Sequence, residues 1–287
     1  MALFTKKEKK ELEPQYFVSA TNMPTYNYKV YHMSLVEKIA YFLLAFAAGA
    51  VVGYLFYGGI GKDQFGRHTT LTMILDILIP AIVGTVAGIL FLPMRTQQII
   101  DKKRSKLNGQ FRDMLEALTT SLGAGKNVPD SFRSVYDDLS VQYDDGAEIL
   151  QELEIIMSGI SHNVDIEDLL MDFGVRSGIE DISSFANVFK ICYRKGGNIK
   201  DTIRNTHNIL SDKMEITEDI ETIVTANKTE QNIMIVMPIG LIGMIKLMSA
   251  DFAANFVTPA GIIATTIGVV LFVAAYFVGK AVLDIKV

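Results

Sequence analysis

The chain has 287 residues, of which 49% are hydrophobic, and a formal net charge of −5. Its mean hydropathy of +0.28 is high for a soluble protein of this size and indicates an integral membrane protein. The single cysteine, Cys192, excludes an intramolecular disulfide framework. The charge is uneven, since residues 107–230 carry roughly 23 acidic and 11 basic side chains, about −12 in total. Such an acidic block excludes nucleic acid as its partner, because phosphate binding needs clustered Lys and Arg.

The chain begins with a polar tail, residues 1–33, which contains a charged run at residues 6–11. No apolar run follows this basic stretch closely enough to make a signal peptide. We expect the tail to be disordered or to lie on a membrane surface.

Four apolar segments are long enough to be transmembrane helices. Residues 34–57 and 71–94 can each cross a hydrocarbon core of about 30 Å, and a short glycine-rich turn joins them. Residues 34–94 are therefore predicted to form a first transmembrane hairpin, whose second apolar segment contains Pro80 and ends at Pro93. Residues 232–248 and 259–282 place a second hairpin at residues 231–287.

Basic residues are concentrated on one side of the first hairpin. The loop inside the hairpin has only Lys62 and Arg67, and several lysines precede the first apolar segment. The cations that follow the second segment are Arg95, Lys102, Lys103, Arg104 and Lys106. The positive-inside rule then predicts a multi-pass protein of the cell membrane, with both termini and the block between the hairpins in the cytoplasm.

Residues 95–230 are predicted to fold as a cytoplasmic helical bundle. Leu107, Phe111, Leu115, Leu118 and Leu122 recur at steps of three and four and form one apolar stripe. Four shorter helices are expected between residues 127 and 196, and a longer one after them. That last helix meets no Gly or Pro over more than 30 residues and is expected to continue into the third apolar segment. The predicted fold class is all-α, with four transmembrane helices and no evident strand.

No catalytic, cofactor-binding or metal-binding constellation is evident, so we expect the chain not to be an enzyme. The four histidines are scattered, and none has a ligand partner at metal spacing. Residues 123–127 contain Gly and Lys, as a phosphate loop does. However, Thr120 stands where that motif needs its first Gly, and Asn127 stands where it needs Ser or Thr. A turn that ends a helix explains this stretch better.

Two acidic pairs mark a candidate docking edge for a partner protein. Asp137 and Asp138 form one pair, Asp144 and Asp145 form the other, and both fall at a polar junction between predicted helices. Exposed carboxylates at this junction would suit a protein with a basic face. An ordinary solvated acidic surface explains them equally well.

Two ionisable residues lie inside the apolar segments. Asp76 is a little over one turn into the second segment, and Lys246 is just before the end of the third. Charges at such positions are costly and often functional, so the two side chains are candidates for an ion pair with each other. Lys246 could instead contact a membrane-borne client. Snorkelling to the membrane interface is the alternative for both.

Small residues recur at helical spacing in the first hairpin. Gly49-x-x-x-Gly53 and Gly84-x-x-x-Gly88 each place two glycines on one face of a predicted span. Such faces let helix backbones approach closely. The motifs predict tight packing within the first hairpin or between subunits.

The order of several short motifs resembles the type II secretion F-domain family. The resemblance covers about residues 107–238 directly and the flanking hairpins by their layout, and none of its motifs is catalytic. The matching residues are Leu107, Gln110, Phe111, Asp113, Leu115, Leu118, Leu122, Gly125, Gly174-Val175-Arg176 with Asp181, Gly196-Gly197-Asn198-Ile199, Thr225-Ala226 and Pro238.

The resemblance implies an inner-membrane platform protein of a type IV pilus-like machine, most similar to the single-domain platforms of tight-adherence (Tad) pilus systems. Such a protein contacts a hexameric secretion ATPase in the cytoplasm and pilin subunits in the membrane. It also implies a paralogous platform protein as partner, a homo- or hetero-oligomer, and no cofactor. Arg176, Gly196 and Gly197 become candidate docking residues. A small polytopic transporter or channel with a regulatory domain, and a ligand-binding sensor, remain the alternatives.

Overall fold

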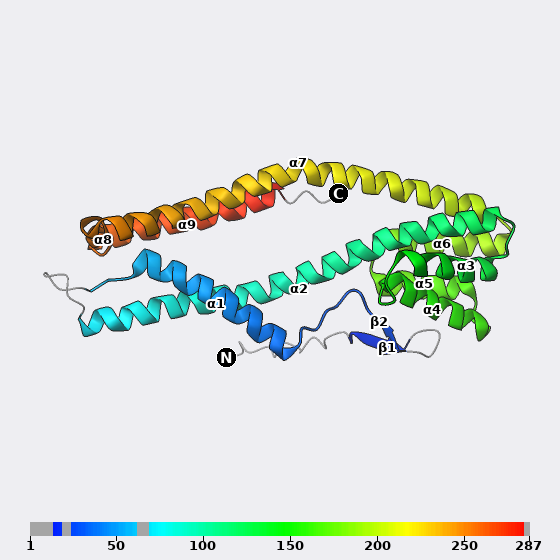
Figure 1. Ribbon diagram of the computed structural model, residues 1–287, viewed down its shortest axis with the longest axis horizontal. Helices are drawn as coiled ribbons and strands as arrows, with labels where there is room; N and C mark the ends of the chain where they lie inside the picture. Colours follow the sequence, from blue (N-terminus) through cyan, green and yellow to red (C-terminus); the bar gives the residue numbers. More distant parts are fainter. Residues whose placement is uncertain (1–13, 19–23, 62–68, 284–287) are drawn as a thin grey trace, which may run out of the picture. The chain divides into compact units, whose positions relative to one another are not determined.

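The computed structural model describes residues 14–18, 24–61 and 69–283, and over these residues the chain is almost entirely helical. The predicted all-α class is confirmed. The charged run at residues 6–11 and the loop cations Lys62 and Arg67 lie outside the described residues. In chain order (Figure 1), the elements are β1 (Tyr16–Val18), β2 (Pro24–Tyr26), α1 (Leu35–Tyr57), α2 (Thr70–Gly123), α3 (Val128–Gln142), α4 (Glu148–Ser161), α5 (Ile166–Ser177), α6 (Glu180–Lys195), α7 (Ile199–Met248), α8 (Ala250–Phe256) and α9 (Pro259–Leu283).

The chain divides into two compact units. The bundle unit comprises the chain up to His32 together with Thr96–Met214, and the apolar unit comprises Met33–Arg95 together with Glu215–Val287. The helices α2 and α7 each contribute to both units. Within the described residues, α1, α2, α7 and α9 are long and apolar enough to cross a membrane.

Helix α2 is longer than its sequence suggests. It continues through Pro80 and Pro93 to Gly123, and so joins the apolar segment that ends at Pro93 to the helix that carries the stripe from Leu107 to Leu122. A proline inside a helix removes one backbone hydrogen bond and costs about 3 kcal/mol. Ending the helix among apolar residues would leave several backbone groups without partners, and this costs more in an apolar environment. Helix α7 similarly runs past Pro238, and here the predicted continuous helix is confirmed.

The glycines of the first hairpin lie where α1 and α2 cross. A Cβ atom added to Gly49 would lie 3.0 Å from the Cα atom of Gly84. A Cβ atom added to Gly84 would lie 2.7 Å from the carbonyl oxygen of Phe46. Gly88 in turn faces the ring of Phe42. Of the two roles predicted for these motifs, the structure shows packing within the hairpin.

The bundle unit has an apolar core built around the predicted stripe of α2. Leu107, Phe111, Leu115 and Leu118 are each 0% exposed, and Leu122 is partly buried against them. Burying side chains of this size contributes about 1.5–3 kcal/mol each, which makes α2 the central helix of this unit. Other core side chains come from α3 to α7 and include Phe132, Leu153, Phe173, Phe185, Phe189 and Ile203.

The N-terminal segment, over its described residues, is not the disordered tail that the sequence predicts. The strands β1 and β2 pair antiparallel, with Tyr16 opposite Tyr26 and Val18 opposite Pro24. The rings of Tyr26 and Tyr28 then meet edge to face, 4.9 Å apart, and Tyr28 is buried in the core of the bundle unit. Strands of three residues are too short to show the alternation by which strands are recognised in a sequence.

Candidate functional site

A buried ion pair between α4 and α5 lies inside the bundle unit. Arg176 and Glu152 are each 1% exposed. Nη1 of Arg176 donates to Oε1 of Glu152 at 2.7 Å, and Nη2 donates to Oε2 at 2.5 Å. Nε of Arg176 donates to Oδ2 of Asp172 at 2.6 Å. This paired geometry is the strongest that a guanidinium and a carboxylate form, and it compensates for removing both charges from water.

The N-terminal segment completes this network. The hydroxyl of Tyr28 donates to Oε1 of Glu152 at 2.9 Å, and the backbone carbonyl of Tyr26 accepts from Nη1 of Arg176 at 3.2 Å. The backbone N–H of Tyr28 donates to the carbonyl of Arg176 at 3.0 Å. The same pair that joins α4 to α5 therefore also holds the segment that leads into α1.

Burial controls the protonation of these groups. It raises the pKa of the Glu152 carboxyl above its usual range, while the hydrogen bonds from Arg176 and Tyr28 act against that rise. Burial alone would lower the pKa of Arg176, but the hydrogen bonds and charges of Glu152 and Asp172 outweigh it and raise that pKa. Burial, followed by the neighbouring charge of Glu152, also raises the pKa of the Tyr28 phenol far above its ordinary value. Tyr28 therefore stays a neutral donor to this carboxyl group.

These positions correct the docking role predicted for Arg176. Its guanidinium is enclosed by Glu152, Asp172 and the N-terminal segment and cannot reach a partner at the surface. Its role in this structure is to hold three parts of the bundle unit together. Removing one member of such a pair typically costs about 3–5 kcal/mol, because the other charge is then buried alone.

The acidic pairs, in contrast, lie at the surface. Asp137 and Asp138 are exposed on the last turns of α3, and Asp144 and Asp145 are exposed in the loop before α4. Between the pairs is Val141, whose side chain is 90% exposed. Protein interfaces typically combine an apolar centre with a polar rim, so an exposed valine that is flanked in the sequence by two acidic pairs is compatible with a docking edge.

A tyrosine links this surface to α4. The hydroxyl of Tyr136 donates to Oε1 of Glu154 at 2.8 Å. That hydrogen bond, followed by the charge of Glu154, raises the pKa of the phenol, and Asp145 and Asp137 add to the rise. Both predicted acidic pairs thus contribute a carboxylate to the field around one phenol. We call Asp137, Asp138, Val141, Asp144, Asp145 and Glu154 the acidic face.

The two predicted glycines form the turn between α6 and α7. Gly196 has a φ of +74°, a left-handed conformation that glycine adopts without strain. The N–H of Gly197 donates to the carbonyl of Cys192 at 2.8 Å and closes the end of α6. Asn198 then accepts from the N–H of Asp201 at 3.3 Å and begins α7. The geometry of the turn alone therefore accounts for the run Gly196-Gly197-Asn198.

Asp76 and Lys246, the two ionisable residues inside the predicted apolar segments, both contact the end of α1. Asp76 accepts from the backbone N–H of Gly59 at 2.6 Å. Nζ of Lys246 donates to the carbonyl of Phe56 at 3.4 Å and lies 5.0 Å from the centre of the Phe256 ring. The salt bridges found among the described residues do not include one between Asp76 and Lys246. The carbonyl of Phe56 is one of the groups that the C-terminal end of a helix leaves without an intrahelical partner, and Lys246 supplies a donor to it.

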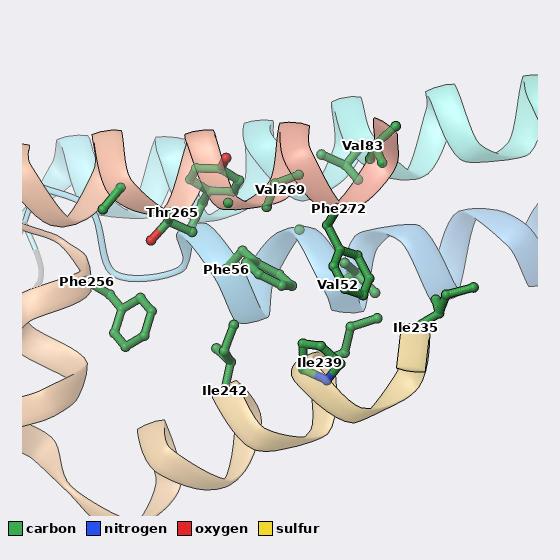
Figure 2. Close-up of a pocket in the computed structure, with 16 residues that line it drawn as sticks. Val52, Phe56, Val83, Ile235, Ile239, Ile242, Phe256, Thr265, Val269 and Phe272 are labelled. Atoms are coloured by element: carbon green, nitrogen blue, oxygen red, sulfur yellow. The ribbon is translucent and has the colours of Figure 1, made fainter. Parts of the chain in front are cut away.

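A pocket of about 650 Å³ lies in the apolar unit (Figure 2). It is lined by residues of α1, α2, α7, α8 and α9, and Figure 2 shows side chains from several of these helices converging on it. Tyr57 and Thr265 supply the hydroxyl groups of an otherwise apolar lining. A path for a polar solute would need polar groups along the interior, and this lining does not provide them.

The described residues give little support for a metal site or a phosphate-binding loop. Across those ranges, no group of three or more His, Cys, Asp and Glu side chains is placed to hold a metal ion. At the end of α2, Lys126 donates to the hydroxyl of Ser134, and Gly125 has a φ of +85°. The stretch that contains Gly and Lys is thus a turn after a helix, as expected.

Reasoning from the sequence does not identify Glu152 or Tyr28. Glu152 is three residues after Ile149 and four before Ile156, on the buried side of α4, but a carboxylate is expected in solvent when no partner is visible in the sequence. Its partner Tyr28 lies 124 residues away along the chain. Only the tertiary structure brings the two together.

Comparison of the chain with protein-family models, with curated proteins and with solved structures found no match. The resemblance to the type II secretion F-domain family therefore stays a prediction that rests on the sequence motifs.

Proposed function

We propose that this chain is a platform protein of the inner membrane, which couples a cytoplasmic secretion ATPase to pilin assembly in a tight-adherence, type IV pilus-like or type II secretion machine. The observation that carries the proposal is the length of two helices. Helix α2 has 54 residues and α7 has 50, and each belongs partly to the apolar unit and partly to the bundle unit. They are about 80 and 75 Å long, whereas the hydrocarbon core of a bilayer is about 30 Å thick.

Both helices are thus long enough to cross a bilayer and continue into a folded domain outside it. In the proposed topology α1, α2, α7 and α9 span the membrane, and the bundle unit and both termini are cytoplasmic. The cations that follow the apolar part of α2 support this orientation.

In this proposal the energy comes from a partner, the secretion ATPase. A helix without a break is stiff enough to pass a displacement of the bundle unit to the membrane-spanning part. The acidic face supplies a charged surface for a basic face of a hexameric ATPase. A paralogous platform protein and pilin subunits are the other proposed partners, with the chain in a homo- or hetero-oligomer.

Charge reversal on the acidic face tests the ATPase contact. The variant Asp137→Lys/Asp138→Lys should recover less of the ATPase than the wild type when the full chain is purified in detergent from its own cells. We expect a loss of more than about tenfold, because like charges placed opposite each other cost several kcal/mol. Mass spectrometry of the copurified proteins identifies the ATPase and measures its amount.

The matched control reverses two exposed carboxylates elsewhere, in Glu218→Lys/Asp219→Lys on α7. It should recover the ATPase at the wild-type level. Equal recovery by both variants would rule out the acidic face as the contact. If the wild type recovers no secretion ATPase and no second platform protein, the proposed function itself is wrong.

The proposed topology has its own test, which uses the single cysteine of the chain. In a Cys192→Ser background, the variant Asp145→Cys places a thiol on the exposed loop before α4. A membrane-impermeant maleimide should label it only after the cells are opened. Labelling of intact cells would place the bundle unit outside the cytoplasm.

A further inference from the structure

Positive side chains gather in the bundle unit next to Gly178, and the proposed function does not use them. Lys29 comes from the segment before α1, whereas Lys103 and Arg104 come from α2. We propose that these three residues, which we call the cation cluster, bind the phosphate of an anionic phospholipid. This inference rests on the membrane location and orientation contained in the proposed function, and it does not depend on the ATPase.

Lys29 and Arg104 lie beside the same glycine. Gly178 follows α5 in a left-handed conformation, with a φ of +62°. A Cβ atom added to it would lie 3.1 Å from Cε of Lys29 and 3.5 Å from Nη2 of Arg104, so the two cationic ends are close neighbours. The same Cβ atom would lie only 2.8 Å from Cγ of Lys29. The absence of a side chain at Gly178 therefore lets Lys29 lie against this helix end.

Lys103 adds a third positive charge. Its Nζ donates to the hydroxyl of Tyr26 at 3.1 Å, and it lies 4.9 Å from the centre of the Tyr26 ring and 5.2 Å from that of Tyr31. These contacts hold the ammonium group against the segment that carries Lys29. They supply no negative charge, because the partners are neutral rings and a hydroxyl group.

The described residues supply no carboxylate partner for these charges. Their ion pairs include no member of the cation cluster, and Nε of Arg104 is buried without a hydrogen-bond partner. Glu180, two residues after Gly178, is exposed and also belongs to none of these pairs. The carbonyl groups at the end of α5 carry about half a negative charge, which offsets only part of two adjacent positive charges. An anion from outside the chain would supply the missing partner.

The sequence around the cluster is depleted in acidic residues. Residues 14–36 contain no Asp or Glu, and residues 95–110 contain only Asp101, which accepts from the side chain of Gln97. The same two stretches contain all three members of the cation cluster and the exposed Lys102. Clusters of Lys and Arg just after a transmembrane helix on its cytoplasmic side are typical of sites for anionic lipids.

The position along α2 favours a lipid phosphate over the carboxylate of a partner protein. Arg104 is ten residues after Met94, the last residue of the second apolar segment, which is about 15 Å along the helix. Side chains of a helix lean towards its N-terminus, which for this part of α2 is the membrane side in the proposed topology. Headgroups extend about 5–8 Å beyond the hydrocarbon core, and long basic side chains can reach them from this distance.

The donors of the cluster suit a phosphodiester. The guanidinium group of Arg104 presents its N–H groups in a planar fork that fits two oxygens of one phosphate, and the ammonium group of Lys29 can donate to the same phosphate. Each cation near the membrane surface raises the affinity for an anionic lipid by about fivefold, so these two together give about 25-fold. A lipid held in this way would attach both α2 and the N-terminal segment to the membrane surface.

A lipid titration of the purified full chain in detergent, followed by native mass spectrometry, tests the proposal. The probe is phosphatidylglycerol, and phosphatidylcholine is the neutral reference. The wild type should retain one phosphatidylglycerol with about 25-fold higher apparent affinity than phosphatidylcholine. Arg104→Gln should reduce this preference to about fivefold, and Lys29→Gln/Arg104→Gln should reduce it to less than about twofold.

Two controls separate a defined site from a general attraction of charges. Lys102→Gln removes an exposed cation next to the cluster and should change the preference by less than about twofold. Arg133→Gln/Lys195→Gln removes two exposed cations from α3 and α6, the same change in net charge as the double variant, and should leave the preference unchanged. A loss in either control as large as that in Arg104→Gln would mean that the attraction is diffuse, and the proposal would be wrong.

Hydrogen exchange in nanodiscs shows where the lipid binds. Replacing phosphatidylcholine by phosphatidylglycerol should protect peptides from residues 24–33 and 174–182 in the wild type, and not in Lys29→Gln/Arg104→Gln. Protection confined to other parts of the chain would place the lipid elsewhere and overturn the proposal.

Inorganic phosphate distinguishes a lipid from a soluble phosphate compound. An excess of inorganic phosphate should leave the retained phosphatidylglycerol in place, because it lacks the acyl chains that keep the lipid at the membrane surface. Displacement by inorganic phosphate, or equal retention of both lipids by the wild type, would contradict a lipid site. These measurements need only the purified chain and lipids, so their outcome is independent of the ATPase experiment.

Discussion

Replacing Arg176 by methionine removes the cation from the buried network and leaves the rest of the chain unchanged. Arg176 donates two hydrogen bonds to Glu152, one to Asp172 and one to the carbonyl of Tyr26. In Arg176→Met the Glu152 carboxylate stays buried without a positive partner, and the N-terminal segment loses one of its attachments. The expected result is a large local loss of stability in the bundle unit.

The burial of the ion pair determines how much stability Arg176→Met should lose. Removing one partner of a fully buried pair costs about 3–5 kcal/mol, which corresponds to an increase of roughly 10² to 10³ in the population of the opened state. The ion pair between Lys190 and Asp168 offers a control in the neighbouring helices, because both side chains are exposed to water, 36% and 48%. Lys190→Met should cost less than about 1 kcal/mol, since an exposed pair is screened by water.

Hydrogen exchange measured by mass spectrometry on the full chain in detergent is a suitable assay, because it resolves local opening. Peptides from α4, α5 and residues 24–33 should exchange roughly 10² to 10³ faster in Arg176→Met, whereas peptides of the apolar unit should not change. The double variant Arg176→Met/Glu152→Met should recover much of the lost protection, since an apolar pair of similar volume leaves no buried charge alone.

Two results would refute this reasoning. One is an effect of Arg176→Met no larger than that of Lys190→Met. The other is a double variant that is less protected than Arg176→Met, because then the stranded charge of Glu152 is not the source of the loss.

Three further changes test other parts of the structure. Gly196→Ala should cost about 1–2 kcal/mol and raise exchange at the end of α6, because a Cβ atom is unfavourable in the left-handed conformation. Gly84→Leu should lower the temperature at which the solubilised chain aggregates, because its Cβ atom would lie 2.7 Å from the Phe46 carbonyl oxygen. Burial and a hydrogen bond to Asp113 raise the pKa of Tyr143 from 10.0 to about 12, so the stabilisation from this neutral phenol is complete below pH 10 and is lost as the pH rises through 12. An ultraviolet titration of phenolate should show this late component in the wild type and not in Tyr143→Phe.

The two glycine changes have matched controls. Gly146→Ala adds a Cβ atom in open space and should leave exchange nearly unchanged. Gly240→Leu does the same on an apolar helix and should leave the aggregation temperature unchanged. A loss of stability as large in these controls would mean that glycine replacement in general is responsible, and not the geometry of Gly196 or Gly84.

The helices and their buried faces could be predicted because they depend on neighbours in the sequence. The spacing from Leu107 to Leu118 identifies one face of a helix, and the structure buries that face. The cap of α3 is equally local, since the side chain of Asn127 accepts from the N–H of Asp130 at 2.8 Å. Pro93 shows where prediction from neighbouring residues fails. A proline inside a helix is unfavourable, but here the helix continues on both sides of it, and its other hydrogen bonds outweigh that cost.

The candidate sites were harder to predict, because they depend on packing between distant segments. The carboxyl group of Glu152 meets Tyr28 and Arg176 only after the N-terminal segment has packed on α4 and α5. Arg176 was therefore assigned to the surface, although it is buried. The pocket of the apolar unit likewise requires residues from α1, α7 and α9, and the sequence pattern of each helix shows only that it is apolar.

The most direct test of the proposed function is a photoreactive residue at the centre of the acidic face. Val141 is 90% exposed between the two acidic pairs, so benzoylphenylalanine can replace it without disturbing the core. Irradiation of living cells should then give a covalent adduct, which mass spectrometry identifies as a subunit of a secretion ATPase. An adduct with this ATPase would place the motor on the acidic face. If the chain is fully expressed and crosslinks only to itself or to unrelated proteins, the acidic face is not the contact with the motor.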